Sequence, residues 1–273
     1  MKRCLRCLVG LILVFLCAAV TVGNRPLHGQ AVVATVPVGS QPIGVCVNPN
    51  NNRVYVSNHE SNTVSVIDGA TNQVIAMVPV GSQPDCVCVN PNNNHVYVTH
   101  ADIGKVTVIN GTTNQVIDKV LVERSHTSVG VSPNTNRVYV TNVLNLASGN
   151  VSVINGTTHQ VIATVPVRTK PRGVCVNSNT NRVYVTYISK HDFRNEGWGT
   201  SGDKVSVIDG ATNQVIATIK VGSQPKGVDV NPNTNRVYVT NQVNGNVSVI
   251  NGATNQVIAT VPVKSGPTGV GVN

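Results

Sequence analysis

A tetrapeptide centred on tyrosine recurs five times along this 273-residue chain and constrains its fold more than any other feature. The pattern is Val-Tyr-Val followed by Ser or Thr, and its tyrosines are Tyr55, Tyr97, Tyr139, Tyr184 and Tyr238. The steps between them are 42, 42, 45 and 54 residues. A second pattern, Val-x-Val-Ile-Asp/Asn-Gly, keeps step with the first at Asp68, Asn110, Asn155, Asp209 and Asn251. Two patterns in step over five copies indicate a tandem repeat, so a fold built from repeated units is expected.

Each repeat holds four short runs rich in Val, Ile, Tyr and Thr, and the runs are separated by turn residues. In the first copy the runs are 44–47, 53–57, 63–67 and 73–80. Such runs are typical of β-strands, and the chain shows no sustained helical period beyond its N-terminal segment. The Asp68-Gly69 pair between the third and fourth runs predicts a hairpin, because both residues tolerate positive φ where a tight turn requires it. The fold class is therefore expected to be all-β.

Four strands in a unit of about 42 residues are the pattern of one β-propeller blade. Apolar runs such as Val54-Tyr55-Val56 fit sheets that neighbouring blades cover on both faces. A parallel β-helix is less suitable, since its coils are shorter and lack four regular turns. One position of the first run holds mainly small residues, as expected for strands crowded around an axis. Its occupants are Cys46, Cys88, Gly130, Cys175, Asp229 and Gly271.

The repeats predict one propeller domain over residues 31–273, with five complete units and a ring that is not complete. The units lie near 43–80, 85–122, 127–167, 172–221 and 226–263, and a partial unit covers 267–273. Residues 30–38 match the fourth run of a repeat, and 266–273 match the first run. A truncated chain whose intact relatives carry more blades is the expected reason, and closure by another subunit is the alternative.

The repeats resemble those of the YVTN β-propeller family. Tyr238-Val239-Thr240-Asn241 is the family signature, and it recurs at 139–142 and, with changes, in the other three copies. The resemblance covers residues 31–273. It implies a propeller fold, seven-bladed in known relatives, and a place in archaeal surface layers or among exported bacterial proteins. It implies little about activity, because propellers carry many unrelated functions.

The N-terminal segment predicts export. Lys2, Arg3 and Arg6 precede an apolar run at 8–22, which together resemble a secretory signal cleaved near residue 23, with 24–30 as a linker. An uncleaved anchor is the alternative. After cleavage no membrane span would remain, and the expected location is the periplasm, the cell surface or the medium. Removing residues 1–30 leaves 16 basic against 11 acidic residues, a mild positive excess.

The candidate binding patch lies on the loops that vary between copies, because variable loops on a rigid scaffold commonly carry function. The insertion at 187–204 in the fourth unit and the loops before the third and fourth units supply basic and aromatic side chains. They are Arg124, His126, Arg168, Lys170, Arg172, His191, Phe193, Arg194 and Trp198. On the opposite face, Arg53, Arg137, Arg182 and Arg236 form an arc with His95, which is interpreted as repeated turn chemistry.

Catalytic and cofactor chemistry find little support in the sequence. There is no Gly-x-Ser-x-Gly motif and no evident Ser-His-Asp arrangement, and acidic residues are scarce. Cys46, Cys86, Cys88 and Cys175 lack the spacing of a zinc motif, so they are interpreted as small residues near the axis, and their disulfide pairing stays open. Neither a metal nor a cofactor is predicted.

Three functions follow as hypotheses. The first is a non-enzymatic exported protein whose loops bind a protein or an anionic surface ligand. The second is an enzyme with a site at the axis, as in dehydrogenase-like or lactonase-like propellers, which requires titratable side chains that converge there. The third is binding of single-stranded DNA through basic and aromatic side chains, a reading that the family resemblance favours slightly.

Overall fold

The computed structural model describes residues 32–101, 103–123, 125–145, 148–168, 170–188 and 203–272. Within these residues the chain forms twenty strands in five four-stranded antiparallel sheets. The predicted signal segment and linker lie outside the described residues. No helix in the described ranges has the length and apolarity needed to cross a membrane.

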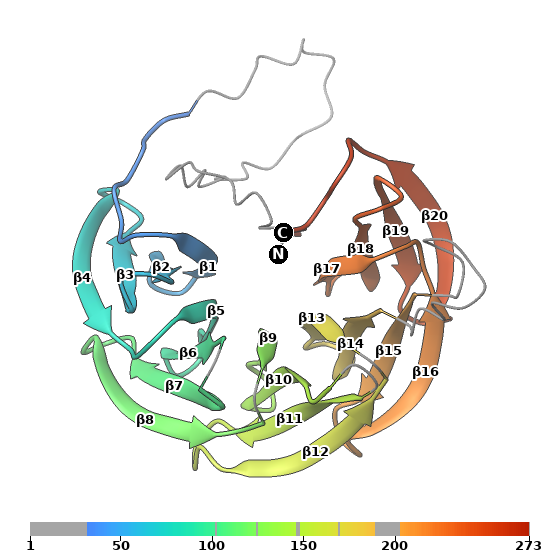
Figure 1. Ribbon diagram of the computed structural model, residues 1–273, viewed down its shortest axis with the longest axis horizontal. Helices are drawn as coiled ribbons and strands as arrows, with labels where there is room; N and C mark the ends of the chain where they lie inside the picture. The colour runs from blue at the N-terminus through green and yellow to red at the C-terminus, as the bar shows by residue number, and fades with distance from the viewer. Residues whose placement is uncertain are drawn as a thin grey trace.

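Each sheet is a blade whose four strands pair in sequence order (Figure 1). The first blade is β1 (Pro42–Asn48), β2 (Arg53–Asn58), β3 (Thr63–Asp68) and β4 (Gln73–Pro79). The second is β5 (Pro84–Asn90), β6 (His95–His100), β7 (Lys105–Asn110) and β8 (Gln115–Leu121). The third is β9 (His126–Ser132), β10 (Arg137–Val143), β11 (Gly149–Asn155) and β12 (Val161–Val167). The fourth is β13 (Pro171–Asn177), β14 (Arg182–Tyr187), β15 (Lys204–Asp209) and β16 (Gln214–Lys220). The fifth is β17 (Pro225–Asn231), β18 (Arg236–Asn241), β19 (Asn246–Asn251) and β20 (Gln256–Pro262).

The blades stand around a common axis, with the first strand of each blade innermost and the fourth outermost (Figure 1). This arrangement confirms the predicted all-β propeller with five complete repeats. The ring is not closed, because the first and fifth blades do not meet (Figure 1). The small-residue position also lies where it was predicted: Cys46 pairs with Tyr55, and Cys88 pairs with Tyr97 in the same register.

Apolar clusters between neighbouring blades hold the ring together. The second and third strands of a blade are buried on both faces, which explains their continuous Val and Tyr runs. Tyr55 and Val64 of the first blade share one cluster with Val87 and Val96 of the second. Full burial of one such side chain stabilises the fold by about 1.5–3 kcal/mol. Several of them therefore stabilise each interface between two neighbouring blades, which we call a joint.

The Ser or Thr that follows Tyr-Val in each repeat links neighbouring blades close to the axis through its hydroxyl group. Thr186 Oγ1 accepts a hydrogen bond from Gly173 N at 2.8 Å and donates one to Lys226 O, in the next blade, at 3.0 Å. Thr141 in the third blade likewise donates to Arg172 O at 3.2 Å. A buried carbonyl without a partner is costly, so this position requires Ser or Thr.

The two ends of the described chain extend the repeat. Val36 packs into a cluster with Val54, Val56 and Ile67, where the fourth strand of a preceding blade would pack. At the other end Val272 N donates a hydrogen bond to the Asp229 carboxylate at 2.8 Å, beside the innermost strand of the fifth blade. Both segments thus take the places that the repeat pattern predicts for a fourth and a first run.

The hairpin predicted at Asp68-Gly69 forms between β3 and β4, although neither of these two residues has a positive φ. The left-handed residue of this turn is Asn72, with φ of 57°, and its amide bonds to Asp68 O at 2.8 Å. Gly69 is needed for space instead, because a side chain there would begin 2.6 Å from the Asn52 carbonyl oxygen. The turn therefore depends on contact with the turn between the first two strands.

Candidate functional site

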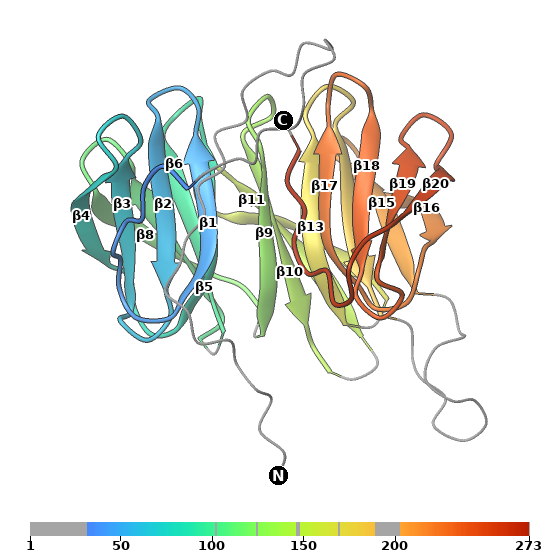
Figure 2. The same cartoon turned by 90° about the horizontal axis from the view of Figure 1, so that it is seen from above.

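The propeller has two unlike faces, which we call the turn face and the loop face. The turn face carries the turns that join the first strand to the second and the third to the fourth, along the upper rim in Figure 2. The loop face carries the connections from the second strand to the third and from each blade to the next.

Polar side chains tie neighbouring blades together on the turn face. Arg182 Nη1 donates to Gly252 O of the next blade at 2.8 Å, and Arg53 bonds to Gly111 O in the same way. Asn48 Nδ2 donates to Asn94 Oδ1 at 2.7 Å across the first joint. These contacts support the interpretation of the arginine arc as repeated turn chemistry.

Part of the predicted binding patch falls outside the described residues. This holds for Arg124, His191, Phe193, Arg194 and Trp198, and for the side chain of His126, whose backbone begins β9. The structure does place the remaining three side chains at the entry to β13. Arg168 is exposed, and Lys170 and Arg172, on either side of Pro171, are half-buried.

Charged residues also occupy the loop-face end of the innermost strands, one position after the strand-opening proline. Asp85 in β5, Arg172 in β13 and Lys226 in β17 share this register. Burial raises the pKa of Asp85, while the charges of His59 and Lys226 act in the opposite direction. Because Lys226 belongs to the fifth blade and Asp85 to the second, this interaction crosses the axis. The repeat pattern could have revealed this position, since it varies in charge from copy to copy.

Two cysteines of the inner strands, Cys86 and Cys175, are poorly suited to thiolate chemistry. Burial raises the pKa of Cys86 to about 12 and that of Cys175 well above its ordinary value. Both thiols therefore stay protonated at neutral pH, whereas the thiolate is the nucleophile and the metal ligand. In the described part of the chain, no group of three or more His, Cys, Asp or Glu residues is arranged to hold a metal ion.

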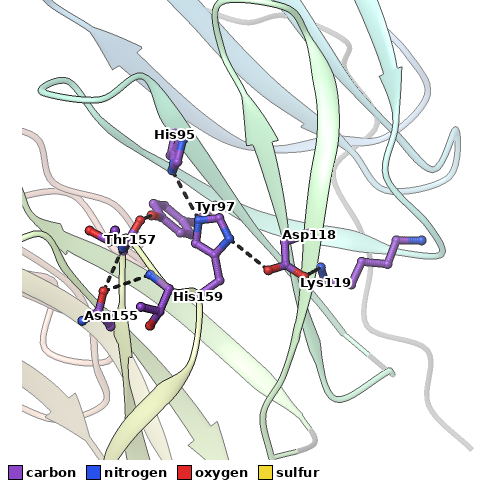
Figure 3. A network of polar contacts seen from close by, with 9 residues as sticks. His95, Tyr97, Asp118, Lys119, Asn155, Thr157 and His159 are labelled. Atoms are coloured by element: carbon purple, nitrogen blue, oxygen red, sulfur yellow. Dashed lines mark hydrogen bonds and ion pairs between the residues drawn. The ribbon is translucent and has the colours of Figure 1, made fainter.

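The joint between the second and third blades holds a polar network that the repeat does not supply elsewhere (Figure 3). His159 Nδ1 lies 2.9 Å from Asp118 Oδ2, and His159 Nε2 lies 3.4 Å from His95 Nδ1. The edge of the Tyr97 ring packs against His159, with ring centroids 6.5 Å apart. The side chain of His159 is 11% exposed and that of Asp118 is 44% exposed, so the network opens toward solvent on one side.

Comparison with known proteins supports the fold reading. A family model described as a YNCE-like beta-propeller matches residues 33–137. Hydrazine synthase of Kuenenia stuttgartiensis has a similar structure, with a TM-score of 0.80 and 18% sequence identity over 88% of this chain and 80% of that one. Together with the five repeats, these matches decide the type of fold. The chain is a β-propeller built from YVTN-type repeats.

For a YVTN-type propeller the matches give the fold and no more. At 18% identity the likeness to hydrazine synthase concerns architecture alone. In all, 1416 chains of solved structures match, so the fold is too widespread to indicate an activity. No curated protein matches the chain.

Sequence patterns single out only part of what this YVTN-type propeller brings together. His95 is recognisable as a member of the turn-face arc, but His159 and Asp118 are not. Each departs from its repeat at a different position: His159 replaces an Asn, Asp118 an Ala and His95 an Arg. A comparison of all copies position by position reveals the three changes, and only the structure shows that they meet.

Proposed function

We propose that this YVTN-type propeller is an exported, non-catalytic binding protein whose loop face takes an anionic surface ligand. One observation carries the proposal: the basic side chains of the two faces are used differently. On the turn face, Arg53, Arg137 and Arg182 are engaged with carbonyl groups of other blades. On the loop face Arg168 is exposed, and Lys170 and Arg172, which are close to it in sequence, are partly exposed.

The chemistry of this loop-face group suits carboxylate, sulfate or phosphate groups. Arg168 and Arg172 each present a planar fork of N–H donors, which pairs with two oxygen atoms of such a group at once. Lys170, between them in sequence, adds a third positive charge. Exposed charges of this kind also steer an oppositely charged partner toward the protein.

The inner strands argue against the enzymatic alternative. Their only carboxylates are Asp85 and Asp229, which belong to the second and fifth blades and lie at different register positions. Burial raises the pKa of both groups. A paired-carboxylate mechanism needs two such groups on opposite sides of one substrate bond, and this separation in register does not favour it.

Charge reversal on the loop face tests the proposal. The full chain and an Arg168→Glu/Arg172→Glu variant are titrated with polyglutamate, heparin and oligo-deoxythymidine at low and high salt. We expect at least tenfold weaker binding of the preferred polyanion, and the preferred probe identifies carboxylate, sulfate or phosphate as the ligand chemistry. N-terminal sequencing of the protein secreted from expressing cells tests export, with cleavage expected near residue 23.

A variant with the same change of net charge provides the control. Lys119→Glu/Arg236→Glu alters two basic residues away from the loop face, on the outer strand β8 and at the exposed start of β18. This variant is expected to bind nearly as tightly as the parent chain. Equal losses in the two variants would show that overall charge, and not the loop face, drives binding.

A further inference from the structure

Three side chains of the joint between the second and third blades depart together from the repeat. At the position of His95 the other copies carry Arg53, Arg137, Arg182 and Arg236. At the position of His159 they carry Asn72, Asn114, Asn213 and Asn255. At the position of Asp118 they carry Ala76, Ala163, Ala217 and Ala259.

These changes come from three separate elements and converge on one point. His95 opens β6, Asp118 lies in β8 and His159 lies in the turn between β11 and β12, as Figure 3 shows. The other joints are held together without two histidines and an aspartate. For example, Arg137 of the third blade bonds to Gly210 O of the fourth. Blade packing alone therefore does not require two histidines and a carboxylate, and their meeting calls for another explanation.

The partners of the two histidines fix which ring nitrogens carry protons. His159 Nδ1 faces the Asp118 carboxylate, which accepts hydrogen bonds only, so Nδ1 is the protonated nitrogen and Nε2 holds a lone pair. Burial and the charge of His159 lower the pKa of His95, while a hydrogen bond to the Gly156 backbone acts in the opposite direction. We assign this bond to Nε2–H, in the role that an arginine plays toward the equivalent glycine at other joints. His95 Nδ1 then also holds a lone pair.

Two lone pairs this close are held together either by a shared proton or by a metal ion. His95 Nδ1 and His159 Nε2 are 3.4 Å apart, which is long for a hydrogen bond between them. Two nitrogen ligands on a tetrahedral zinc ion, with bonds of about 2.0–2.1 Å, lie about 3.3–3.4 Å apart. The observed spacing thus matches an edge of a zinc coordination tetrahedron.

We propose that His95 and His159 form a two-histidine site for a divalent transition metal, with zinc the best match. Asp118 and the Gly156 carbonyl hold the rings from behind, which is the arrangement common around metal-bound histidines. Water completes the coordination, so the site is exchangeable and keeps positions open for a ligand from a partner. It lies at the turn-face joint and is independent of the proposed loop-face function.

Zinc titration of the full chain by calorimetry tests the proposal, and the chain itself supplies the matched variants. His95→Arg, His159→Asn and Asp118→Ala each restore the residue that the other copies carry at that position. The two histidine variants are expected to lose at least tenfold in zinc affinity. Asp118→Ala, which removes only the outer support of His159, is expected to lose about tenfold.

The variants also separate this site from other zinc ligands. All three keep every cysteine, so zinc bound by thiols would persist in them and cancel in the comparison. Equal zinc affinity in the parent chain and in His95→Arg would overturn the proposal. So would the absence of zinc binding to the parent chain at pH 7.5, because the histidine pair would then share a proton and not a metal. Circular dichroism and melting temperature show that each variant is folded.

Discussion

The turn face and the loop face of this propeller are built from the same repeat but follow different rules. On the turn face, side chains bond from one blade to the next, as Asn90 does to Asn136 and Asn177 to Asn235. A change in one copy there disturbs two blades. On the loop face the connections differ in length and charge from copy to copy, since the blades are held together elsewhere. The repeated chemistry thus marks the joints, and the variable chemistry marks the surface available for binding.

The largest effect is expected where the turn face has no space for a side chain. A Cβ atom added at Gly210 would lie 2.4 Å from Asn181 Oδ1 and 2.8 Å from the Asn181 carbonyl oxygen. We expect Gly210→Ala to lower the free energy of unfolding by about 3 kcal/mol, because the backbone of the adjacent turn would have to move. Chemical denaturation monitored by circular dichroism measures the loss.

A loop-face glycine provides the comparison for that variant. Gly245 has φ of 63°, and the nearest atom to an added Cβ is 3.6 Å away. Asn tolerates this left-handed conformation, so Gly245→Asn is expected to change the free energy of unfolding by less than about 0.5 kcal/mol. Similar losses at both positions would contradict the idea that the two faces are packed under different constraints.

A smaller effect is expected from the arginines. Arg182 reaches Gly252 O of the next blade, whereas Arg236, at the same position of the fifth blade, is exposed beside the opening of the ring. Arg182→Ala should cost about 1–2 kcal/mol, since a charged group donates to a carbonyl that would lose its partner. Arg236→Ala and the loop-face Arg168→Ala should each cost less than about 0.5 kcal/mol. Thermal melts of the three variants rank them, and a loss at Arg236 equal to that at Arg182 would show that the inter-blade bond contributes nothing.

The repeat predicts the blades well because it is local and duplicated. The strand boundaries, the innermost position of Cys46 and the need for Ser or Thr after Tyr-Val all follow from patterns that recur in step. A repeating sequence pattern does not reveal contacts between residues that occupy different positions in different repeats. Asp118 resembles an isolated surface acid, and His159 a variant of a turn Asn, until the ring places them side by side. The loop-face charges show the same limit: Asp85 and Lys226 interact across the axis, over a sequence separation that no periodicity describes.

The smallest effects concern carboxylates, and they should have opposite signs at the two faces. On the turn face, hydrogen bonds from the Thr212 and Ala211 amides lower the pKa of Asp209. Its charged form therefore stabilises the fold above the unfolded pKa of about 3.9, and this contribution is lost as the pH falls through the lower folded value. Asn251 makes the same turn with an amide oxygen, so Asp209→Asn keeps the turn and removes only the charge.

Asp85, at the loop-face end of β5, has its pKa raised by burial, so its charged form weakens the fold at neutral pH. The expected result is that Asp209→Asn melts slightly below the parent chain at pH 7 and Asp85→Asn slightly above it. Both differences should shrink as the pH falls toward 3, because Asp85 is then neutral and the contribution of the Asp209 charge has begun to be lost. Melting curves at pH 7, 5 and 3 measure this convergence. Shifts of the same sign at pH 7 would show that the two carboxylates share one environment, and the contrast between the faces would then be limited to packing.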